Sequence, residues 1–303
     1  MLDSLLDQSL VGYTALGHRW RDLPPIDVDL QGRVALVTGA TSGLGRSAAE
    51  SLARLGAKVI LVGRNPDKTA GVADAIIRDS GNPEVCTEIA DLSSMAEIRA
   101  LAARLEGPIH LLVNNAGVLL PERSETDEGF ETTFATNLLG HFLLTELLIE
   151  KLEEPARIIN VSLGGMYTQR IRVDDLQMER GRYDGAVAYA RTKRAQVILT
   201  EIWAERLRDR GIVVHSMHPG WADTPGVSES LPTFYKLTKP LLRTPEQGAD
   251  TIVWLCASPE AARKTGLFWH DRTPRPTHRS QRTRETAEER KALWDRLSSM
   301  ISA

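Results

Sequence analysis

The feature that most constrains this sequence is a repeated alternation between short apolar runs and longer amphipathic segments. The runs lie at residues 34–37, 58–62, 109–113, 157–161 and 212–215. They are rich in β-branched residues and nearly continuous in apolar character, which is typical of strands buried on both faces. The segments between them are long enough for helices, and strands that alternate with helices form βαβ units. We therefore predict an α/β fold built on a doubly wound parallel sheet.

Length and composition limit the class of protein. The chain has 303 residues, which fits about two domains or one large domain with extensions. Hydrophobic residues make up 42% and charged residues 25%, as in an ordinary folded globular chain. Lys and Arg number 37 against 40 Asp and Glu, and this near balance predicts no nucleic-acid partner. The two cysteines, Cys86 and Cys256, cannot build a disulfide framework and favour a reducing, cytoplasmic location.

Membrane and metal sites are not expected. No apolar run is long enough to cross a bilayer, so integral membrane insertion is disfavoured. The first residues include Asp3 and Asp7, where a signal peptide would carry positive charge. The histidines are scattered without ligand spacing, so we predict no metal site. His218 directly precedes Pro219, which favours a positional role over a catalytic one.

A glycine-rich turn follows the first predicted strand and precedes an apolar helical segment. It reads Thr38-Gly-Ala-Thr-Ser-Gly-Leu-Gly45. Glycines let the backbone approach a phosphate without a Cβ clash, and the helix that begins near Gly43 points free N–H groups at that phosphate. This strand–turn–helix context favours a nucleotide-binding loop over a plain tight turn. The cofactor-binding residues predicted here are Gly39, Thr41, Ser42, Gly43, Leu44 and Gly45.

The end of the second predicted strand indicates which nucleotide is bound. In dinucleotide-binding folds an acidic residue at this position holds the ribose diol, whereas a nearby arginine accommodates a 2′-phosphate. This chain has Gly63 and Arg64 there. The planar guanidinium of Arg64 suits a phosphate, so we predict NADP in preference to NAD. The alternative is that Arg64 is only a solvated surface residue.

A tyrosine and a lysine stand four residues apart in a long helical segment before the last parallel strand. This spacing places Tyr189 and Lys193 on one helix face. A nearby ammonium favours the phenolate, so we expect the pKa of Tyr189 to be lowered toward the range useful for acid–base chemistry. Tyr235 and Lys239 repeat the spacing, but Pro240 disfavours helical geometry at Lys239. We therefore predict that Tyr189, rather than Tyr235, is the acid–base residue.

Together these motifs resemble the short-chain dehydrogenase/reductase family in its single-domain branch, over about residues 32–270. Further motifs that carry the resemblance are Asp91, at the position that follows the third strand of the family fold, Asn114-Asn-Ala-Gly117 and Pro219-Gly220. The segment from Asn137 to Thr145 is similar to the retinol-dehydrogenase-like group. The resemblance implies a Rossmann-like fold and hydride transfer between a nicotinamide cofactor and an alcohol or carbonyl carbon.

The resemblance also implies roles for the matching residues. Tyr189 would exchange a proton with the substrate oxygen, Lys193 would hold the nicotinamide ribose, and Asn137 would anchor a water in the proton relay. Helix-kink and helix-cap roles are the alternatives for Asn137 and Asp91. The cofactor-binding positions that the resemblance implies are Asp91, Leu92, Asn115, Ala116, Gly117, Tyr189, Lys193, Pro219, Gly220 and Thr224.

One position departs from the family pattern. Members usually carry a serine that hydrogen-bonds the substrate carbonyl at the end of the fifth strand of the family fold, which corresponds here to residues 157–161, whereas this chain reads Val161-Ser-Leu-Gly164. Leu163 occupies the catalytic position and Ser162 the one beside it, and successive strand side chains face opposite ways. Three interpretations stay open: Ser162 or a backbone N–H replaces the missing donor, the enzyme is slow, or the chain is a nucleotide-binding sensor or scaffold without turnover.

The order of the motifs favours one domain with extensions at both ends. We expect an amphipathic N-terminal helix over residues 1–30, the catalytic domain over 31–270, and a basic strap with a terminal helix over 271–303. Apolar residues in segments 163–188 and 225–243 suit a lipophilic alcohol or carbonyl substrate, although packing under the loops would give the same composition. The family resemblance also allows a homodimer.

Overall fold

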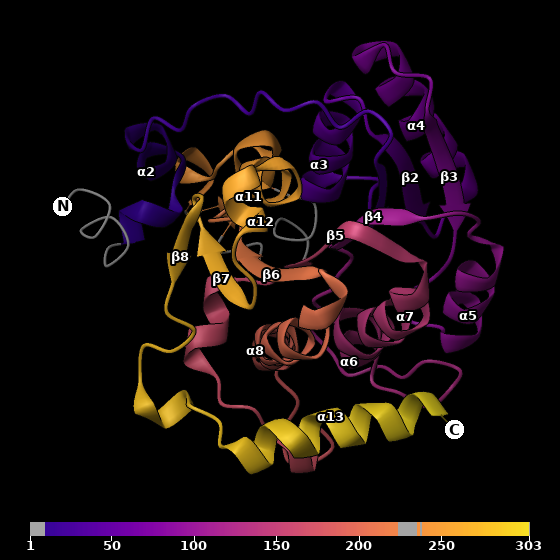
Figure 1. Ribbon diagram of the computed structural model, residues 1–303. Helices are drawn as coiled ribbons and strands as arrows, with labels where there is room; N and C mark the ends of the chain where they lie inside the picture. The colour runs from indigo at the N-terminus through magenta and orange to yellow at the C-terminus, as the bar shows by residue number, and fades with distance from the viewer. Residues whose placement is uncertain (1–9, 224–234, 237, 303) are drawn as a thin grey trace.

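The computed structural model describes residues 10–223, 235–236 and 238–302. Within them, eight strands form one sheet in the order β3-β2-β1-β4-β5-β6-β7-β8, with helices on both faces (Figure 1). This is the doubly wound α/β fold that the sequence predicts. The strands are β1 (Val34–Thr38), β2 (Lys58–Gly63), β3 (Val85–Ile89), β4 (Ile109–Asn114), β5 (Leu152–Val161), β6 (Val213–His218), β7 (Leu267–His270) and β8 (Thr273–Arg275).

The strand order reverses direction at the middle of the sheet. All neighbours from β3 to β7 are parallel, and β1 lies between β2 and β4. Ligands of open parallel sheets bind beyond the carboxyl ends of the strands at such a reversal. The loops after Thr38 and Asn114 meet at this edge because β1 and β4 pair in parallel. The topology therefore predicts a ligand-binding site at this edge of the sheet.

The central strands separate two apolar cores. Leu36 of β1 packs on one face, while Ala35 and Val37 of the same strand pack on the other. A strand buried on both faces needs apolar residues at nearly every position. This explains why the strands read as continuous apolar runs rather than as an alternating pattern.

Two helices begin with reciprocal capping contacts. Before α11, Thr244 Oγ1 accepts from Gln247 N and Gln247 Oε1 accepts from Thr244 N. Thr286 and Glu289 make the same pair of bonds before α13, and each pair satisfies two otherwise free N–H groups. The α-helices are α2 (Ala15–Trp20), α3 (Gly43–Arg54), α4 (Pro66–Ser80), α5 (Met95–Arg104), α6 (Thr132–Phe134), α7 (Gly140–Leu148), α8 (Gly185–Arg206), α11 (Pro245–Ala257), α12 (Pro259–Ala262) and α13 (Ala287–Ser302), and the π-helix η2 (Ala135–Leu139) joins α6 to α7.

The N-terminal segment differs from the single amphipathic helix expected over residues 1–30. Residues 1–9 lie outside the described part, and the rest forms the short 3₁₀ turn η1 (Leu10–Tyr13) and helix α2. Thr14 separates these two elements because its backbone is extended and its side chain accepts from the N–H of Gly17. Trp20 is 50% exposed rather than packed inward. The expected continuous helix is therefore broken at a capping residue.

The sheet continues past residue 270, where the boundary of the catalytic domain was expected. β7 and β8 form an antiparallel hairpin, and its turn residues Asp271 and Arg272 have φ angles of 48° and 56°. Left-handed backbone at consecutive turn residues matches the twist of a tight hairpin. The first part of the expected strap is thus the last part of the sheet.

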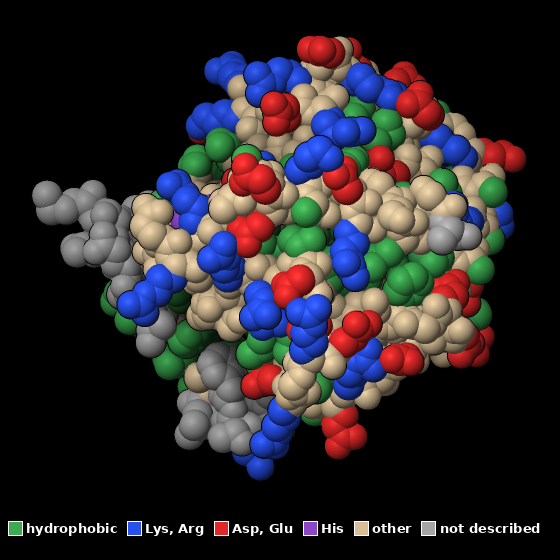
Figure 2. Space-filling model, turned by 90° about the horizontal axis from the view of Figure 1, so that it is seen from below, with side chains coloured by type: hydrophobic (Ala, Val, Ile, Leu, Met, Phe, Trp, Pro, Cys, Tyr) green, Lys and Arg blue, Asp and Glu red, His purple; other side chains and the backbone are tan. Residues whose placement is uncertain are grey.

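Helix α13 covers part of the helical layer formed by α7 and α8 (Figure 1). Leu293 and Leu297 are fully buried, and Trp294 contacts the edge of Phe142 at 5.1 Å between ring centroids. Figure 2 shows the molecule from the side on which α13 lies, and basic and acidic side chains are interspersed on that face. The C-terminal helix therefore belongs to the core rather than to a separate arm.

Candidate functional site

A cavity of about 850 Å³ lies at the carboxyl ends of the parallel strands. It brings together residues that are far apart in the sequence, from the glycine-rich turn to the Pro-Gly pair. The predicted residues on its wall are Gly39, Thr41, Ser42, Gly43, Leu44, Arg64, Asp91, Leu92, Asn115, Ala116, Gly117, Ser162, Tyr189, Lys193, Pro219 and Gly220. Gly45 and Asn137 are not on the wall, and Thr224 lies outside the described residues.

The glycine-rich turn is held against the loop after β4. Gly39 has a φ of 64°, and a Cβ there would stand 2.8 Å from the Cα of Ala116. A Cβ at Gly45 would stand 2.4 Å from Asn115 Nδ2, which donates to the carbonyl of Thr38 at 2.8 Å. Glycine is thus required for the close approach of the two loops. Asn115 fixes the turn in place.

The start of α3 and the end of β2 fit a phosphate-bearing ligand. Ser42 is the N-cap of α3, yet its side chain makes no capping hydrogen bond, so the first N–H groups of the helix receive no cap from this residue. Arg64 is exposed at the rim of the same cavity. A helix N-terminus and a guanidinium both favour anions. The residues present therefore suit a dinucleotide.

Asp91 forms a local turn after β3. Its carboxylate accepts from the backbone N–H of Ser93 at 2.8 Å and from the hydroxyl of the same residue at 2.7 Å. The N-cap of α5 is Ser94 rather than Asp91. Asp91 is therefore not the helix cap, and it lies on the cavity wall.

Tyr189 and Lys193 lie on adjacent turns of α8 at the cavity. Lys193 Nζ is 5.4 Å from the centroid of the Tyr189 ring and donates to the carbonyl of Val161 at 2.7 Å. Burial raises the pKa of Tyr189 to about 12 and lowers the pKa of Lys193 to about 7. The expected lowering of the tyrosine pKa is thus not found, because burial dominates and Lys193 directs its ammonium at a carbonyl.

Asn137 lies in the π-helix between α6 and α7 and is fully buried. Its side chain accepts from the N–H of Val118 at 2.8 Å and donates to the carbonyl of Val118 at 2.9 Å. A Cβ at Gly117 would stand 3.2 Å from Asn137 Oδ1 and 3.7 Å from Lys193 Nζ. Asn137 therefore anchors the loop that passes over Lys193.

Ser162 and Leu163 occupy the end of β5 without distortion. The backbone N–H of Ser162 donates to Met217, which continues the pairing with β6, and Leu163 has an extended backbone. Ser162 is 2% exposed, and its hydroxyl donates to the carbonyl of Lys193 at 2.9 Å. That hydroxyl is thus committed to α8, while Leu163 lies on the cavity wall.

Several cavity residues could not be found from sequence motifs. Tyr13 comes from the N-terminal segment, Tyr167 follows β5, Trp221 follows the Pro-Gly pair, and Arg279 comes from the C-terminal segment. Arg279 lies 4.6 Å from the Tyr167 ring centroid and 5.9 Å from that of Tyr13. The only sequence signal for these four residues is their aromatic or cationic character. They stand at no fixed spacing in the sequence, so no motif identifies them.

The segments expected to face the substrate are divided between cavity and core. In segment 163–188, Leu163 and Tyr167 lie on the cavity wall, whereas Met166, Ile171 and Met178 are buried. In segment 225–243, Leu242 lines the cavity and Leu241 is exposed. Val227, Leu231 and Phe234 lie outside the described residues. Both packing and cavity lining therefore account for the apolar composition.

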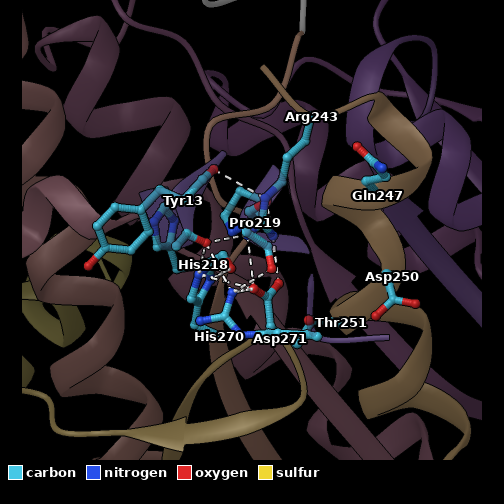
Figure 3. A network of polar contacts seen from close by, with 12 residues as sticks. Tyr13, His218, Pro219, Arg243, Gln247, Asp250, Thr251, His270 and Asp271 are labelled. Carbon is cyan, nitrogen blue, oxygen red and sulfur yellow. Dashed lines mark hydrogen bonds and ion pairs between the residues drawn. The ribbon is translucent and has the colours of Figure 1, made fainter. Parts of the chain in front are cut away.

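A buried ionic cluster lies beside the cavity and joins three distant segments (Figure 3). Arg243 makes two bonds to the Asp271 carboxylate, at 2.5 and 2.9 Å, and Arg21 makes another. Arg243 also donates to the carbonyls of Gly12, at 2.7 Å, and Pro219, at 3.3 Å. We call Arg21, Arg243, His270 and Asp271 the clamp, because they hold the N-terminal segment against the hairpin.

The clamp also explains the glycine of the Pro-Gly pair. Gly220 has a φ of 78°, and a Cβ there would stand 2.3 Å from Arg243 Nε. A larger residue would therefore displace the arginine from its carboxylate and carbonyl partners. Through this contact the clamp reaches the cavity edge.

Two further features of the described residues concern membranes and metal ions. Among the helices described here, none is long and apolar enough to cross a membrane. Within residues 10–223, 235–236 and 238–302, no group of three or more His, Cys, Asp or Glu is arranged to hold a metal ion. The wall of the cavity carries the glycine-rich turn, Arg64, Tyr189 and Lys193.

Known proteins are similar to this chain in sequence and in fold. Residues 33–172 match the short chain dehydrogenase family. The chain is 42% identical to dehydrogenase/reductase SDR family member 12 of Bos taurus over 88% of this chain and 86% of the relative, and 36% identical to retinol dehydrogenase 12 of Mus musculus over 89% and 86%. A short chain dehydrogenase of Escherichia coli CFT073 complexed with NADPH superimposes with a TM-score of 0.65 at 27% identity, covering 82% of this chain and all of that one. The chain therefore belongs to the short-chain dehydrogenase/reductase family and is an oxidoreductase that acts on CH–OH groups.

Proposed function

We propose that this oxidoreductase uses NADP to interconvert a lipophilic alcohol and its carbonyl compound, with Tyr189 as the acid and base. The observation that carries the proposal is the placement of Tyr189, Lys193 and the glycine-rich turn on the wall of one cavity. When bound, the nicotinamide cofactor supplies or accepts the hydride. The protein supplies the proton, the orientation and the shelter from water.

The proton chemistry falls to Tyr189 and Lys193. A phenol with a raised pKa is protonated at neutral pH, so Tyr189 can give its proton to a substrate oxygen as that oxygen gains negative charge. Burial lowers the pKa of Lys193 to about 7, so its amine can hold or release a proton under the same conditions. Asn137 and Ser162 act as positioning residues, since one holds the loop over Lys193 and the other bonds the backbone of Lys193.

The cofactor is proposed to bind other residues of the same cavity wall. The start of α3 suits the pyrophosphate, and Arg64 suits the 2′-phosphate of NADP. Asp91, Leu92 and the loop from Asn115 to Gly117 complete this wall. The relative complexed with NADPH supports the preference for a phosphorylated cofactor.

The substrate is proposed to be lipophilic. Leu163, Tyr167 and Trp221 give part of the cavity wall an apolar and aromatic character, which suits a hydrophobic carbonyl compound. The retinol dehydrogenase name of one relative agrees with this class. The free cysteines Cys86 and Cys256 support a cytoplasmic location, and a homodimer is proposed on the family resemblance alone.

The experiment that tests the mechanism replaces Tyr189 by phenylalanine. With NADPH and a panel of n-alkanals, aryl ketones and retinal, Y189F should lower kcat by about 10²–10⁴, because the proton donor is lost. Y235F is the matched control, since Tyr235 and Lys239 repeat the spacing and do not line the cavity. Turnover by Y189F at the rate of the unaltered protein would overturn the mechanism.

The cofactor preference is tested by titrating NADPH and NADH against the tryptophan fluorescence of R64A. A charge-assisted hydrogen bond contributes about 1.5–3 kcal/mol, so NADPH affinity should fall about tenfold or more while NADH affinity changes little. R78A, an exposed arginine of α4 paired with Asp79, serves as the control. Equal loss of both cofactors would contradict the role of Arg64.

One observation favours a second function. Leu163 stands where the family has a hydroxyl donor, and the hydroxyl of Ser162 is engaged by α8. A chain without that donor could bind the nucleotide as a sensor or scaffold and turn over little. Tight NADPH binding without turnover, together with activity created by L163S, would establish this second function in place of the first.

A further inference from the structure

The proposed reaction lacks one hydrogen-bond donor. A carbonyl oxygen gains negative charge in the transition state, and one missing donor costs about 10²–10³ in rate. Leu163 has no donor, and Ser162 donates to the backbone of Lys193. A working enzyme therefore needs another polar group close to the end of β5.

His218 lies at that place. β5 and β6 pair in parallel, and the register that joins Val161 to Met217 sets His218 beside Ser162 at the ends of the two strands. His218 lies on the cavity wall. A Cβ at Gly164 would stand 2.9 Å from His218 Nε2. Because Gly164, itself a wall residue, has no side chain, the imidazole can lie directly against the segment that begins at Leu163.

The imidazole of His218 has no hydrogen-bond partner among the described residues, at either ring nitrogen. The side chain is 3% exposed. An unsatisfied buried polar group costs about 1–3 kcal/mol, so native proteins seldom keep one without a use for it. Since both nitrogens are unpaired, either can carry the proton, and the N–H makes no bond to the protein that a substrate oxygen would have to replace.

The orientation of the ring is fixed by its neighbours. The ring centroid of His218 is 4.9 Å from that of Tyr13 and 4.8 Å from that of His270, and the planes of the two histidines are 22° apart (Figure 3). His270 Nδ1 lies 3.0 Å from the carbonyl of His218. A donor held by packing is preorganised and loses little entropy on binding.

We propose that His218 supplies the hydrogen bond to the substrate oxygen that a serine at position 163 would otherwise give, which makes it a further catalytic residue of this chain. The inference rests on the proposed function. The neutral imidazole donates its N–H to the oxygen, Tyr189 provides the proton, and the histidine itself is unchanged at the end of the reaction.

The charge state of the ring suits this role. Burial keeps the pKa of His218 well below its ordinary value, and the neighbouring His270, Arg243 and Arg279 lower it further, against the opposite effect of Asp271. The ring is therefore neutral at pH 7, so it competes with Tyr189 as a hydrogen-bond donor but not as a proton donor.

The test removes the imidazole of His218 and then restores a hydrogen-bond donor at position 163. H218L keeps a side chain of similar volume and should lower kcat by about 10²–10³ with little change in NADPH affinity. H218Q retains an N–H donor and should lose less than H218L. In the double variant L163S/H218L the serine hydroxyl should restore kcat at least tenfold over H218L. The assay uses NADPH with retinal, an n-alkanal and an aryl ketone, and thermal melting with NADPH titration checks that each variant is folded.

The outcomes separate this inference from the proposed function. If the unaltered protein reduces none of the carbonyl probes, the proposed function fails. If the unaltered protein is active and H218L has the same kcat, the assignment of His218 is wrong. If H218L is inactive, binds NADPH normally and is not rescued by L163S, then His218 acts only through its packing on Tyr13, and the inference is likewise overturned. Rescue by L163S supports it.

Discussion

Two sets of buried polar side chains lie at the same edge of the sheet, and they differ in how completely their hydrogen bonds are satisfied. In the clamp, the two oxygens of Asp271 receive bonds from Arg243 and Arg21. On the cavity wall, Lys193 contacts a backbone carbonyl, and His218 has no partner among the described residues. Both sets are almost fully buried.

The difference separates groups that hold the fold from groups that are available to a ligand. A buried charge is tolerable when it is paired, and removal of one partner leaves the other charge uncompensated. An unpaired buried group lowers stability and is retained where it has a use. Mutations in the clamp should therefore lower the stability of the fold, whereas mutations in the cavity wall should lower the activity.

The largest expected effect is the loss of the clamp carboxylate. D271A leaves Arg243 and Arg21 buried without their counter-charge, and this should lower the free energy of unfolding by about 3–5 kcal/mol. Urea denaturation measures the loss. The control is D295A, which removes an exposed pair with Lys291 on α13 and should cost less than about 1 kcal/mol. Equal losses in the two variants would show that the clamp does not stabilise the fold.

The clamp also shows where sequence reasoning stops. The alternation of apolar runs and helices predicted the doubly wound sheet, because a strand buried on both faces must be apolar along its length. The glycine-rich turn and the Tyr189–Lys193 pair could be found because their residues are close in sequence. Arg243 and Asp271 are 28 residues apart, and Arg243 bonds Gly12 across 231. No local pattern indicates such contacts.

The same limit applies to the cavity wall. The register of β5 and β6 sets His218 beside Ser162, and neither residue has a local signal of this pairing. The expected N-terminal helix failed for a related reason. Its apolar spacing predicts one continuous helix, although Thr14 caps the short helix α2 and so separates it from the residues before it. Local signals thus predicted the elements and the glycine-rich turn, while the rest of the cavity wall depends on contacts between distant segments.

The next effect concerns Lys193 and the pH dependence of stability. Burial lowers its pKa to about 7 in the folded protein, whereas the unfolded chain keeps the ordinary value of 10.5. Between pH 7 and pH 9 the unfolded chain therefore binds more protons, and stability should rise with pH by about 1.4 kcal/mol per unit. Urea denaturation at several pH values should show this rise in the unaltered protein, relative to K193M. Parallel pH profiles for the two proteins would contradict a lowered lysine pKa.

The smallest effect gives the sharpest contrast with the clamp. H218L replaces an unpaired imidazole by an apolar side chain of similar volume, and removal of an unsatisfied buried group should raise the free energy of unfolding by about 1 kcal/mol. The same variant is expected to lose turnover, so stability and activity should move in opposite directions. Denaturation of H218L beside D271A measures this directly. A loss of several kcal/mol in H218L would place His218 with the clamp, as a residue that holds the N-terminal segment, because its ring packs against Tyr13 and His270.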